Sequence, residues 1–249
     1  MYCFQEIEYA VRQGDTLFRL AEDYQTTVPA LIALNPGIDP YNLVVGSVIR
    51  ICPGETRSMT DGEAMNVPAD CEKRMILKDQ MRLAWSQHVY WTRLLLISLA
   101  HRLNDTTETT NRVLRNPKDI ANIYAQYYSP EAAAKLENII TEHLKIGSAL
   151  IVALRDGNTE EADRLTHEWY INAGAMADAF VDINPYYNHS QMHEMFYTHL
   201  DLTTEEVLAR LANDFQADIE AFDKVEREAM MMADYLALGI IEQFPQMFA

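Results

Sequence analysis

The sequence predicts a multidomain protein in which a small α+β unit precedes an all-α helical bundle. Residues 1–52 are rich in turn residues, and β-branched residues lie near both ends of the segment 8–52. Residues 73–249 instead follow a helical period and contain few glycines and prolines. Between them, residues 53–72 hold prolines, glycines and small polar residues with neither period. We therefore expect a small module, a linker and a bundle.

The small module has the predicted order strand, helix, helix, strand. Residues 8–12 alternate as a short strand, and Gly14 makes a tight turn into a helix. Thr27 is placed to cap a second helix, which ends at residues 35–37 because proline and glycine do not continue a helix. Residues 48–51 alternate again and form the closing strand.

This pattern resembles the LysM family over residues 8–52. The matching residues agree in order and spacing, and they are Tyr9, Val11, Gly14, Asp15, Thr16, Leu17, Leu20, Ala21, Tyr24, Val28, Leu31, Leu34, Asn35, Pro36, Leu43, Gly46, Ile49 and Ile51. The resemblance implies binding of an N-acetylglucosamine polymer, either peptidoglycan or a chitin-like glycan. It also implies a shallow groove between the turn after the first strand and the loop after the second helix.

The two predicted groove walls are short segments of this module. They consist of Gly14, Asp15, Thr16 and Leu17 on one side and of Asn35, Pro36, Gly37 and Ile38 on the other. Backbone groups at the turns can pair with an acetamido group, while Leu17 and Ile38 offer its methyl an apolar seat. Alternatively, the turn residues serve only backbone geometry, and both interpretations can hold together. A single module should bind weakly, so firm attachment calls for several copies in a homo-oligomer.

Composition limits the partners. The formal net charge is −17, from 37 acidic and 20 basic residues, which disfavours nucleic acid and anionic lipid surfaces. The longest apolar run, residues 94–100, is far shorter than the roughly 20 residues of a membrane span, so no membrane insertion is expected. The first eight residues lack the pattern of a secretory signal. Cys3, Cys52 and Cys71 are too few for a disulfide scaffold, although a bridge between Cys3 and Cys52 is geometrically conceivable.

The helical part is predicted to contain four long helices, enough for a bundle. The expected helices cover residues 73–104, 117–127, 130–156, 159–183, 189–199 and 203–243. Pro117 and Pro130 suit first-turn positions. Thr203 and Glu206 have the spacing of a capping box at the start of the last helix.

Polar residues interrupt the apolar stripe of each long helix near its midpoint. These residues are His88, Thr92, His143, Asn172 and Asp218. Aligned midpoints place them at one height in a bundle, which predicts a buried polar layer whose members satisfy one another.

Three interpretations of this layer remain open. The first is a hydrogen-bonded network in which Asp218 orients a histidine. The second is a zinc or iron site formed by His88, His143 and Asp218. The third is a small-molecule pocket. Apart from that metal, no cofactor is expected. His189 and His193 can share a helix face, but the sequence identifies no third ligand for them.

No catalytic residue is predicted, because the chain lacks a phosphate-binding glycine loop, a nucleophile elbow and a catalytic cysteine context. The helical part also resembles uncharacterised proteins of spore-forming bacteria, through residues 87–93, 141–144, 153–158 and 197–203. Some of those relatives carry an acetylglutamate kinase label, which the absence of phosphate loops and alternating strands does not support.

The sequence is therefore interpreted as a non-catalytic binding protein that attaches an acidic helical bundle to a cell wall, spore cortex or spore coat after synthesis in the cytoplasm. One alternative is a metal-binding or enzymatic bundle delivered by the glycan-binding module. The other is a self-assembling structural protein.

Overall fold

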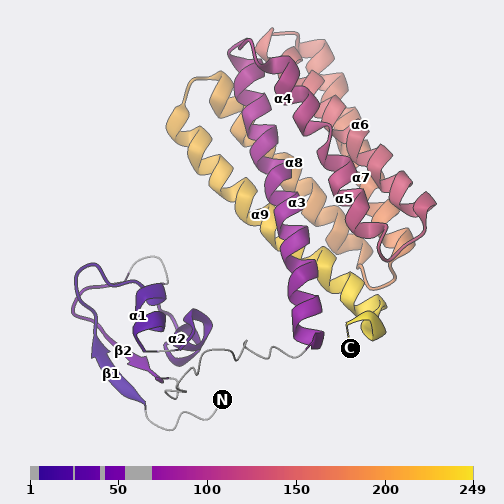
Figure 1. The fold of residues 1–249 in the computed structure, drawn as a ribbon. Coiled ribbons are helices and arrows are strands. Elements are labelled where there is room, and N and C mark those ends of the chain that lie inside the picture. Colours follow the sequence, from indigo (N-terminus) through magenta and orange to yellow (C-terminus); the bar gives the residue numbers. More distant parts are fainter. Residues whose placement is uncertain (1–5, 25, 40–42, 54–68, 249) are drawn as a thin grey trace. The chain divides into compact units, whose positions relative to one another are not determined.

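The structure is a computed structural model in which the chain divides into two compact units, residues 1–66 and 67–249. The described residues are 6–24, 26–39, 43–53 and 69–248. A small unit of strands and helices precedes a helical unit, as the sequence predicts (Figure 1). Most of the predicted linker lies outside the described residues, so its boundaries stay a prediction.

The small unit has the predicted order strand, helix, helix, strand. Strand β1 (Ile7–Ala10) pairs antiparallel with β2 (Val48–Ile51), with Ile7 opposite Ile51. Helices α1 (Leu17–Asp23) and α2 (Val28–Leu34) lie between the strands in sequence and pack on them around one small core. The fully or nearly buried residues of this core are Val11, Leu17, Leu20, Ala21, Leu31, Ile49 and Ile51.

Threonines begin both short helices. The side chain of Thr16 accepts a hydrogen bond from the amide of Arg19, and Thr27 accepts one from the amide of Ala30. Each satisfies a backbone donor that the first turn of a helix leaves free.

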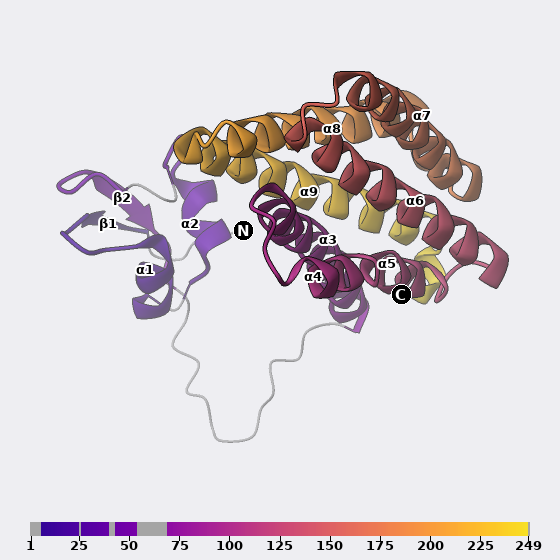
Figure 2. The same cartoon turned by 90° about the horizontal axis from the view of Figure 1, so that it is seen from above.

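Over residues 69–248, the helical unit is a bundle of five long helices with two short ones. The elements are α3 (Ala69–Ala100), α4 (Thr106–Val113), α5 (Asn116–Tyr124), α6 (Pro130–Arg155), α7 (Thr159–Ile183), α8 (His189–Leu211), α9 (Phe215–Gln243) and a closing 3₁₀ turn, Pro245–Met247. Going round the bundle, α3 packs on α9, α9 on α8, α8 on α7, and α7 on α6 (Figures 1 and 2). The short helices α4 and α5 pack on α3, and α5 also packs on α6.

Side-chain caps mark the starts of the later long helices. Ser129, Asn158, Asn188 and Asp214 each accept a hydrogen bond from the backbone amide three residues later. Pro130 occupies the first turn of α6, as expected. Within the described residues, none of these helices is both long and apolar enough to cross a membrane.

The predicted helix break at residues 200–202 is wrong. Helix α8 runs through it, and Thr203 does not cap a helix but donates its hydroxyl hydrogen to the backbone oxygen of His199, 2.7 Å away. The chain breaks instead after Leu211, where Asn213 adopts a left-handed backbone (φ 59°) and Asp214 caps α9. The Thr203–Glu206 pair therefore has the spacing of a capping box without its role.

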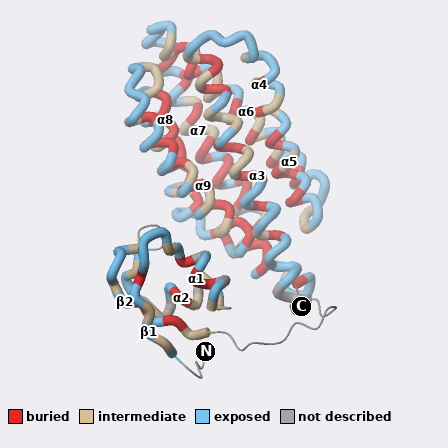
Figure 3. The backbone as a smooth tube through the Cα atoms, turned by 60° about the vertical axis from the view of Figure 1, so that its left-hand side comes forward, coloured by how far each residue is buried: buried red, intermediate tan, exposed pale blue. Residues whose placement is uncertain are grey.

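Buried residues of each helix face the inside of the bundle (Figure 3). Three helical glycines let aromatic rings approach closely. A Cβ atom at Gly239 would lie 2.0 Å from the ring of Tyr187, and one at Gly147 would lie 3.2 Å from the ring of Trp169. A Cβ at Gly174 would lie 3.1 Å from the hydroxyl of Tyr197. Gly147 and Gly174 therefore accommodate side chains from a neighbouring helix, and Gly239 accommodates the ring of Tyr187 from the connection between α7 and α8.

Candidate functional site

The small unit has a surface hollow beside the loop that follows α2. Its lining residues are Asn35, Pro36, Gly37, Ile38, Asp39, Leu43, Val44, Ser47, Val48, Ile49 and Arg50. Val44 is 66% exposed and Val48 is 61% exposed, so apolar side chains border a hollow that also contains turn backbone. Val45 is equally exposed, at 61%, but lies outside the lining.

Asn35 holds the two sides of this hollow together. Its Nδ2 donates to the backbone oxygens of Leu31 (2.7 Å) and Arg50 (2.8 Å), and its Oδ1 accepts from the amide of Arg50 (2.7 Å). These bonds join the end of α2 to β2. Gly37, two residues after Asn35 in the same turn, has a φ of 89°, a left-handed backbone conformation that favours glycine. The side chain of Asn35 therefore serves the shape of the site.

The first predicted wall does not line this hollow. Asp15 accepts hydrogen bonds from the hydroxyl of Tyr9 (2.8 Å) and the amide of Arg12 (2.7 Å), and these bonds lower the pKa of Asp15. Gly14 makes the expected turn, with φ 89°. Leu17 is only 2% exposed and belongs to the core, so the expectation that it offers an apolar seat is wrong.

Three buried histidines of the bundle share one hydrogen-bonding pattern. Their Nδ1 atoms each lie 2.9 Å from a side-chain oxygen, and the pairs are His88 with Asn116, His143 with Asn172, and His199 with Glu228. The amide nitrogens of Asn116 and Asn172 donate to the backbone oxygens of Ala84 and Ile139. Each amide oxygen therefore faces its ring, and the ring must donate from Nδ1.

This arrangement makes Nδ1 the hydrogen-bond donor in all three rings, and in the neutral rings of His88 and His143 the Nε2 atom then carries a lone pair. All three rings line one largely enclosed cavity of about 40 Å³. Burial lowers the pKa of His88 to about 4 and that of His143 to about 3, so both are neutral near pH 7. Thr92 also lines the cavity, and among the described residues its buried Oγ1 has no hydrogen-bond partner. The remaining walls are mainly apolar.

Asp218 lies in a different network. Both of its oxygens accept hydrogen bonds from Arg93 at 3.0 Å, and Arg210 donates to it as well. Arg93 also pairs with Glu206 at 2.5 Å, and burial raises the pKa of Glu206 to about 7. The Asp218 carboxylate is thus hydrogen-bonded to two guanidinium groups.

The structure therefore corrects the predicted layer. His88, Thr92 and His143 line one cavity, and Asn172 supports His143. Asp218 does not orient a histidine and does not join His88 and His143 as a metal ligand, because it is paired with arginines. The predicted metal set is wrong for this reason.

The sequence pattern did not point to His199 or Glu228. The predicted break at residues 200–202 places His199 at the end of a short helix, outside the four long helices expected to form the core. The signal was present nonetheless, because His199 is followed at helical spacing by Thr203 and Val207, which also line the cavity.

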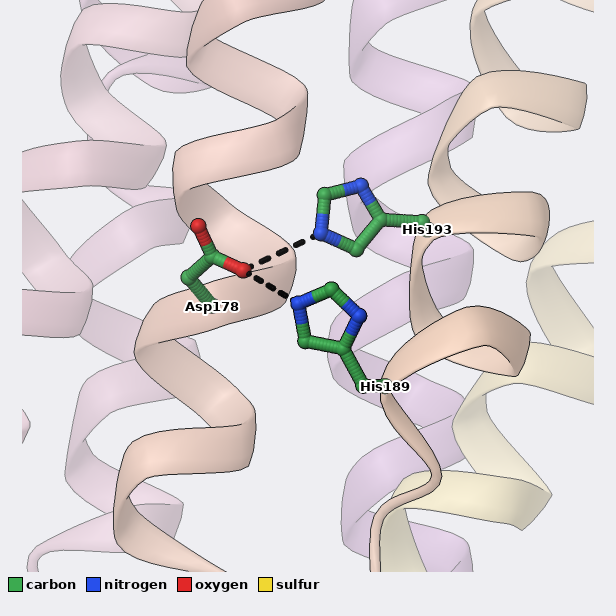
Figure 4. A group of neighbouring side chains, drawn as sticks. All are labelled: Asp178, His189 and His193. Atoms are coloured by element: carbon green, nitrogen blue, oxygen red, sulfur yellow. Dashed lines mark hydrogen bonds and ion pairs between the residues drawn. The ribbon is translucent and has the colours of Figure 1, made fainter.

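A third cluster lies on the surface between α7 and α8. Oδ1 of Asp178 lies 2.9 Å from Nε2 of His189 and 3.0 Å from Nε2 of His193 (Figure 4). The oxygen and nitrogen atoms that could bind a metal all lie within 4.8 Å of one another. Among the described residues, no other group of three His, Cys, Asp or Glu side chains is gathered as closely. Asp178 supplies the third group of suitable chemistry, which the sequence did not identify because Asp178 lies on another helix.

Cysteine chemistry adds one fact. Cys52 is disulfide-bonded. Cys3, the partner suggested by the sequence, lies outside the described residues, as does the side chain of Cys71.

Comparison with known proteins identifies the small unit alone. Residues 9–51 match the LysM domain. No curated protein and no solved structure matches the chain. LysM domains bind peptidoglycan- and chitin-type glycans, which indicates glycan binding and cell-wall association for this protein.

Proposed function

We propose that the protein binds an N-acetylglucosamine polymer in the hollow beside the loop after α2, and that it thereby attaches the helical bundle to a cell wall. The observation that carries this proposal is the exposed apolar border formed by Val44 and Val48 next to the 35–39 turn, inside a LysM domain. The role is non-catalytic.

The chemistry of the sugar suits such a hollow. An acetamido group presents a donor, an acceptor and a methyl group on one short arm. The exposed turn residues Pro36 and Gly37 can offer a carbonyl group and an N–H group to the first two, while the valines and Ile38 cover the methyl. Recognition then depends on backbone held in place by Asn35, and not on a charged side chain.

The proposed location is the cell wall, or the cortex or coat of a spore. One hollow of this size binds weakly, so we propose that several copies act together on a polymeric surface. The negative charge of the chain, −17, is compatible with a neutral glycan chain.

A sedimentation assay with insoluble peptidoglycan, chitin and cellulose tests this proposal. The full-length protein should sediment with the first two and not with cellulose, which lacks the acetamido group. The double variant Val44→Ser/Val48→Thr should bind about 30-fold more weakly, because each change removes an apolar contact worth about 1 kcal/mol.

The matched control is Val45→Ser, whose side chain is equally exposed but outside the hollow. It should bind like the wild type. Equal losses in both variants, or no sedimentation of the wild type with either acetylated polymer, would remove the proposal.

A second candidate function is binding of a small ligand in the bundle cavity. The observation that favours it is that three rings whose Nδ1 atoms are the donors line one cavity. The neutral Nε2 acceptors of His88 and His143, together with the apolar walls, select a neutral molecule with a hydroxyl donor. One water molecule needs about 10–15 Å³ of cavity space. A cavity of about 40 Å³ therefore admits a ligand of only a few non-hydrogen atoms.

Nuclear magnetic resonance of the histidine side-chain nitrogens tests this candidate, with ethanol and propan-1-ol as probes. The Nε2 signals of His88, His143 and His199 should shift and saturate, while the signal of the exposed His167 should not. A uniform, unsaturating drift of all histidine signals would exclude the cavity as a binding site for such molecules.

A further inference from the structure

We propose that Asp178, His189 and His193 bind one divalent transition-metal ion, such as Zn²⁺, on the surface of the bundle. The site connects α7, which supplies the carboxylate, with α8, which supplies both imidazoles (Figure 4). It is independent of glycan binding and of the buried histidine cavity.

The ligand atoms already have the spacing of a coordination site. Zinc lies about 2.0–2.2 Å from nitrogen and oxygen ligands, which places neighbouring ligand atoms about 3 Å apart or slightly more. Here the carboxylate oxygen lies 2.9 and 3.0 Å from the two ring nitrogens. Small movements of the side chains would therefore make room for the ion.

Helix geometry brings the two imidazoles together. His189 and His193 are four residues apart, so they lie on the same face of α8, and their ring centroids are 4.5 Å apart. Both rings direct Nε2 toward the same oxygen of Asp178 (Figure 4). One carboxylate oxygen therefore already lies between the two ring nitrogens that would share the ion with it.

The neighbouring seam of α7 and α8 holds one of the ligands in place. Gly174 lies one turn before Asp178, and a Cβ atom there would lie 3.4 Å from Cε1 of His193 and 3.1 Å from the hydroxyl of Tyr197. The ring of Tyr197 packs edge-on against His193, with centroids 5.7 Å apart. The His193 ring is thus fixed between two helices, which reduces the entropy lost on binding an ion.

The ligand types select the class of metal. Two imidazoles and one carboxylate suit zinc, ferrous iron, cobalt or nickel, whereas Mg²⁺ and Ca²⁺ prefer sets made of oxygen alone. The side chains of His189 and Asp178 are 63% and 55% exposed, so water can complete the coordination shell. A net charge of −17 raises the local concentration of cations.

Metal binding requires the proton on Nε2 of each imidazole ring to be relocated. In the ion-free form each Nε2–H donates to Asp178, whereas metal coordination uses the Nε2 lone pair. A neutral ring therefore loses its proton from Nε2 and gains one at Nδ1 through solvent. The exposed face of the site gives water access for this exchange.

Calorimetric titration of the chelator-treated full-length protein with Zn²⁺ tests the proposal. The wild type should bind one ion that His189→Ala and His193→Ala each weaken at least about tenfold. Asp178→Asn, which keeps the shape of the side chain, should weaken it as well. The control is His167→Ala, which removes an exposed histidine of α7 outside the group and should bind like the wild type.

Cobalt(II) substitution gives a second readout that does not depend on affinity. Cobalt held by imidazole and carboxylate has visible bands without a thiolate charge-transfer band, and the visible bands should change in Asp178→Asn. Circular dichroism would confirm that each variant is folded. Unchanged Zn²⁺ affinity in the two histidine variants, a thiolate band, or no binding by the wild type would overturn the proposal.

Discussion

The two units of this protein use polar side chains differently. In the small unit, polar side chains mainly bind backbone groups: Asp15 accepts from the amide of Arg12, Thr27 from that of Ala30, and Asn35 from that of Arg50, 15 residues away. In the bundle, polar side chains bind one another across helices. His88 and Asn116 are 28 residues apart, and Arg93 and Asp218 are 125 residues apart.

The difference shows what each unit needs. The small unit has too little core to fix its turns by packing, so hydrogen bonds from side chains to backbone fix them. The bundle has a large core and buries charged and polar groups that must be paired inside it. Disturbance of a pair in the bundle should therefore cost more than disturbance of a turn in the small unit.

The largest effect is expected for Asp218→Ala. This change leaves Arg93 and Arg210 partly buried without their shared carboxylate and should lower the free energy of unfolding of the bundle by about 3–5 kcal/mol. Tryptophan fluorescence during urea unfolding measures it selectively, because Trp85, Trp91 and Trp169 all lie in the bundle.

The control for this change is Asp223→Ala, which removes an exposed acid of the same helix and should alter stability by no more than about 0.5 kcal/mol. If both variants lost the same amount, the buried network would have no special role, and the comparison between the two units would fail.

The next effect is expected for His143→Leu. The change leaves Oδ1 of Asn172 without its donor and should destabilise the bundle by about 1–3 kcal/mol near pH 7. Sedimentation with peptidoglycan should stay as in the wild type. A folded variant that lost glycan binding would contradict the separation of the two units.

The same variant tests the pH dependence. In the folded bundle the pKa values of His88 and His143 are about 4 and 3, below the ordinary value of 6.5. The unfolded chain therefore binds more protons, and stability falls as the pH decreases from about 6.5 toward 4. The pKa of Glu206 is raised to about 7, so its contribution acts in the opposite direction between about 7 and 4.5.

Urea unfolding at several pH values would measure these contributions. His143→Leu should lose less stability than the wild type on acidification, and Glu206→Gln should lose more. If the free energy of unfolding of the wild type rose steadily as the pH was lowered from 6.5 to 4, the neutral state of the buried histidines would be contradicted.

A smaller effect is expected for Asn35→Ala in the small unit. Loss of its bonds to Leu31 and Arg50 should destabilise that unit by about 1–2 kcal/mol and leave the tryptophan transition unchanged. Hydrogen exchange over residues 7–51 measures the local effect, with the exposed Asp23→Ala as the control. A shifted tryptophan transition would mean that the two units depend on each other.

The smallest effect is expected for Thr92→Val, and it has the opposite sign. The variant replaces a buried hydroxyl that has no partner among the described residues with a methyl of similar size, so it should stabilise the bundle by about 1 kcal/mol. The tryptophan transition measures this too. Destabilisation would show that the hydroxyl binds something inside the cavity.

How much the sequence reveals follows the same division. The small unit was predictable in order and in its caps, because its turn signals lie within a few residues of the groups they bind. The assignment of Leu17 to the groove wall was wrong, since its place in the turn motif does not reveal which way the side chain points. The new border of the hollow, Val44 and Val48, comes from tertiary packing.

In the bundle, helical periods located most helices and several polar core positions, yet not their partners. Asp218 and the histidines occupy similar positions in their stripes, and only the three-dimensional packing separates the arginine network from the histidine cavity. The apparent capping box at Thr203 also led to the wrong helix break at residues 200–202, and this break concealed the core position of His199. Pairings between helices are set by packing, on which a period within one helix carries no information.

The glycines that seat aromatic rings also bear on protein engineering. Replacing helical glycine with alanine is a common way to raise thermal stability, since alanine favours the helix by about 1 kcal/mol. At Gly239 the added methyl would collide with Tyr187, and at Gly147 it would press on Trp169. A thermostabilised version of this bundle should therefore keep both glycines and place its substitutions on exposed helix surfaces.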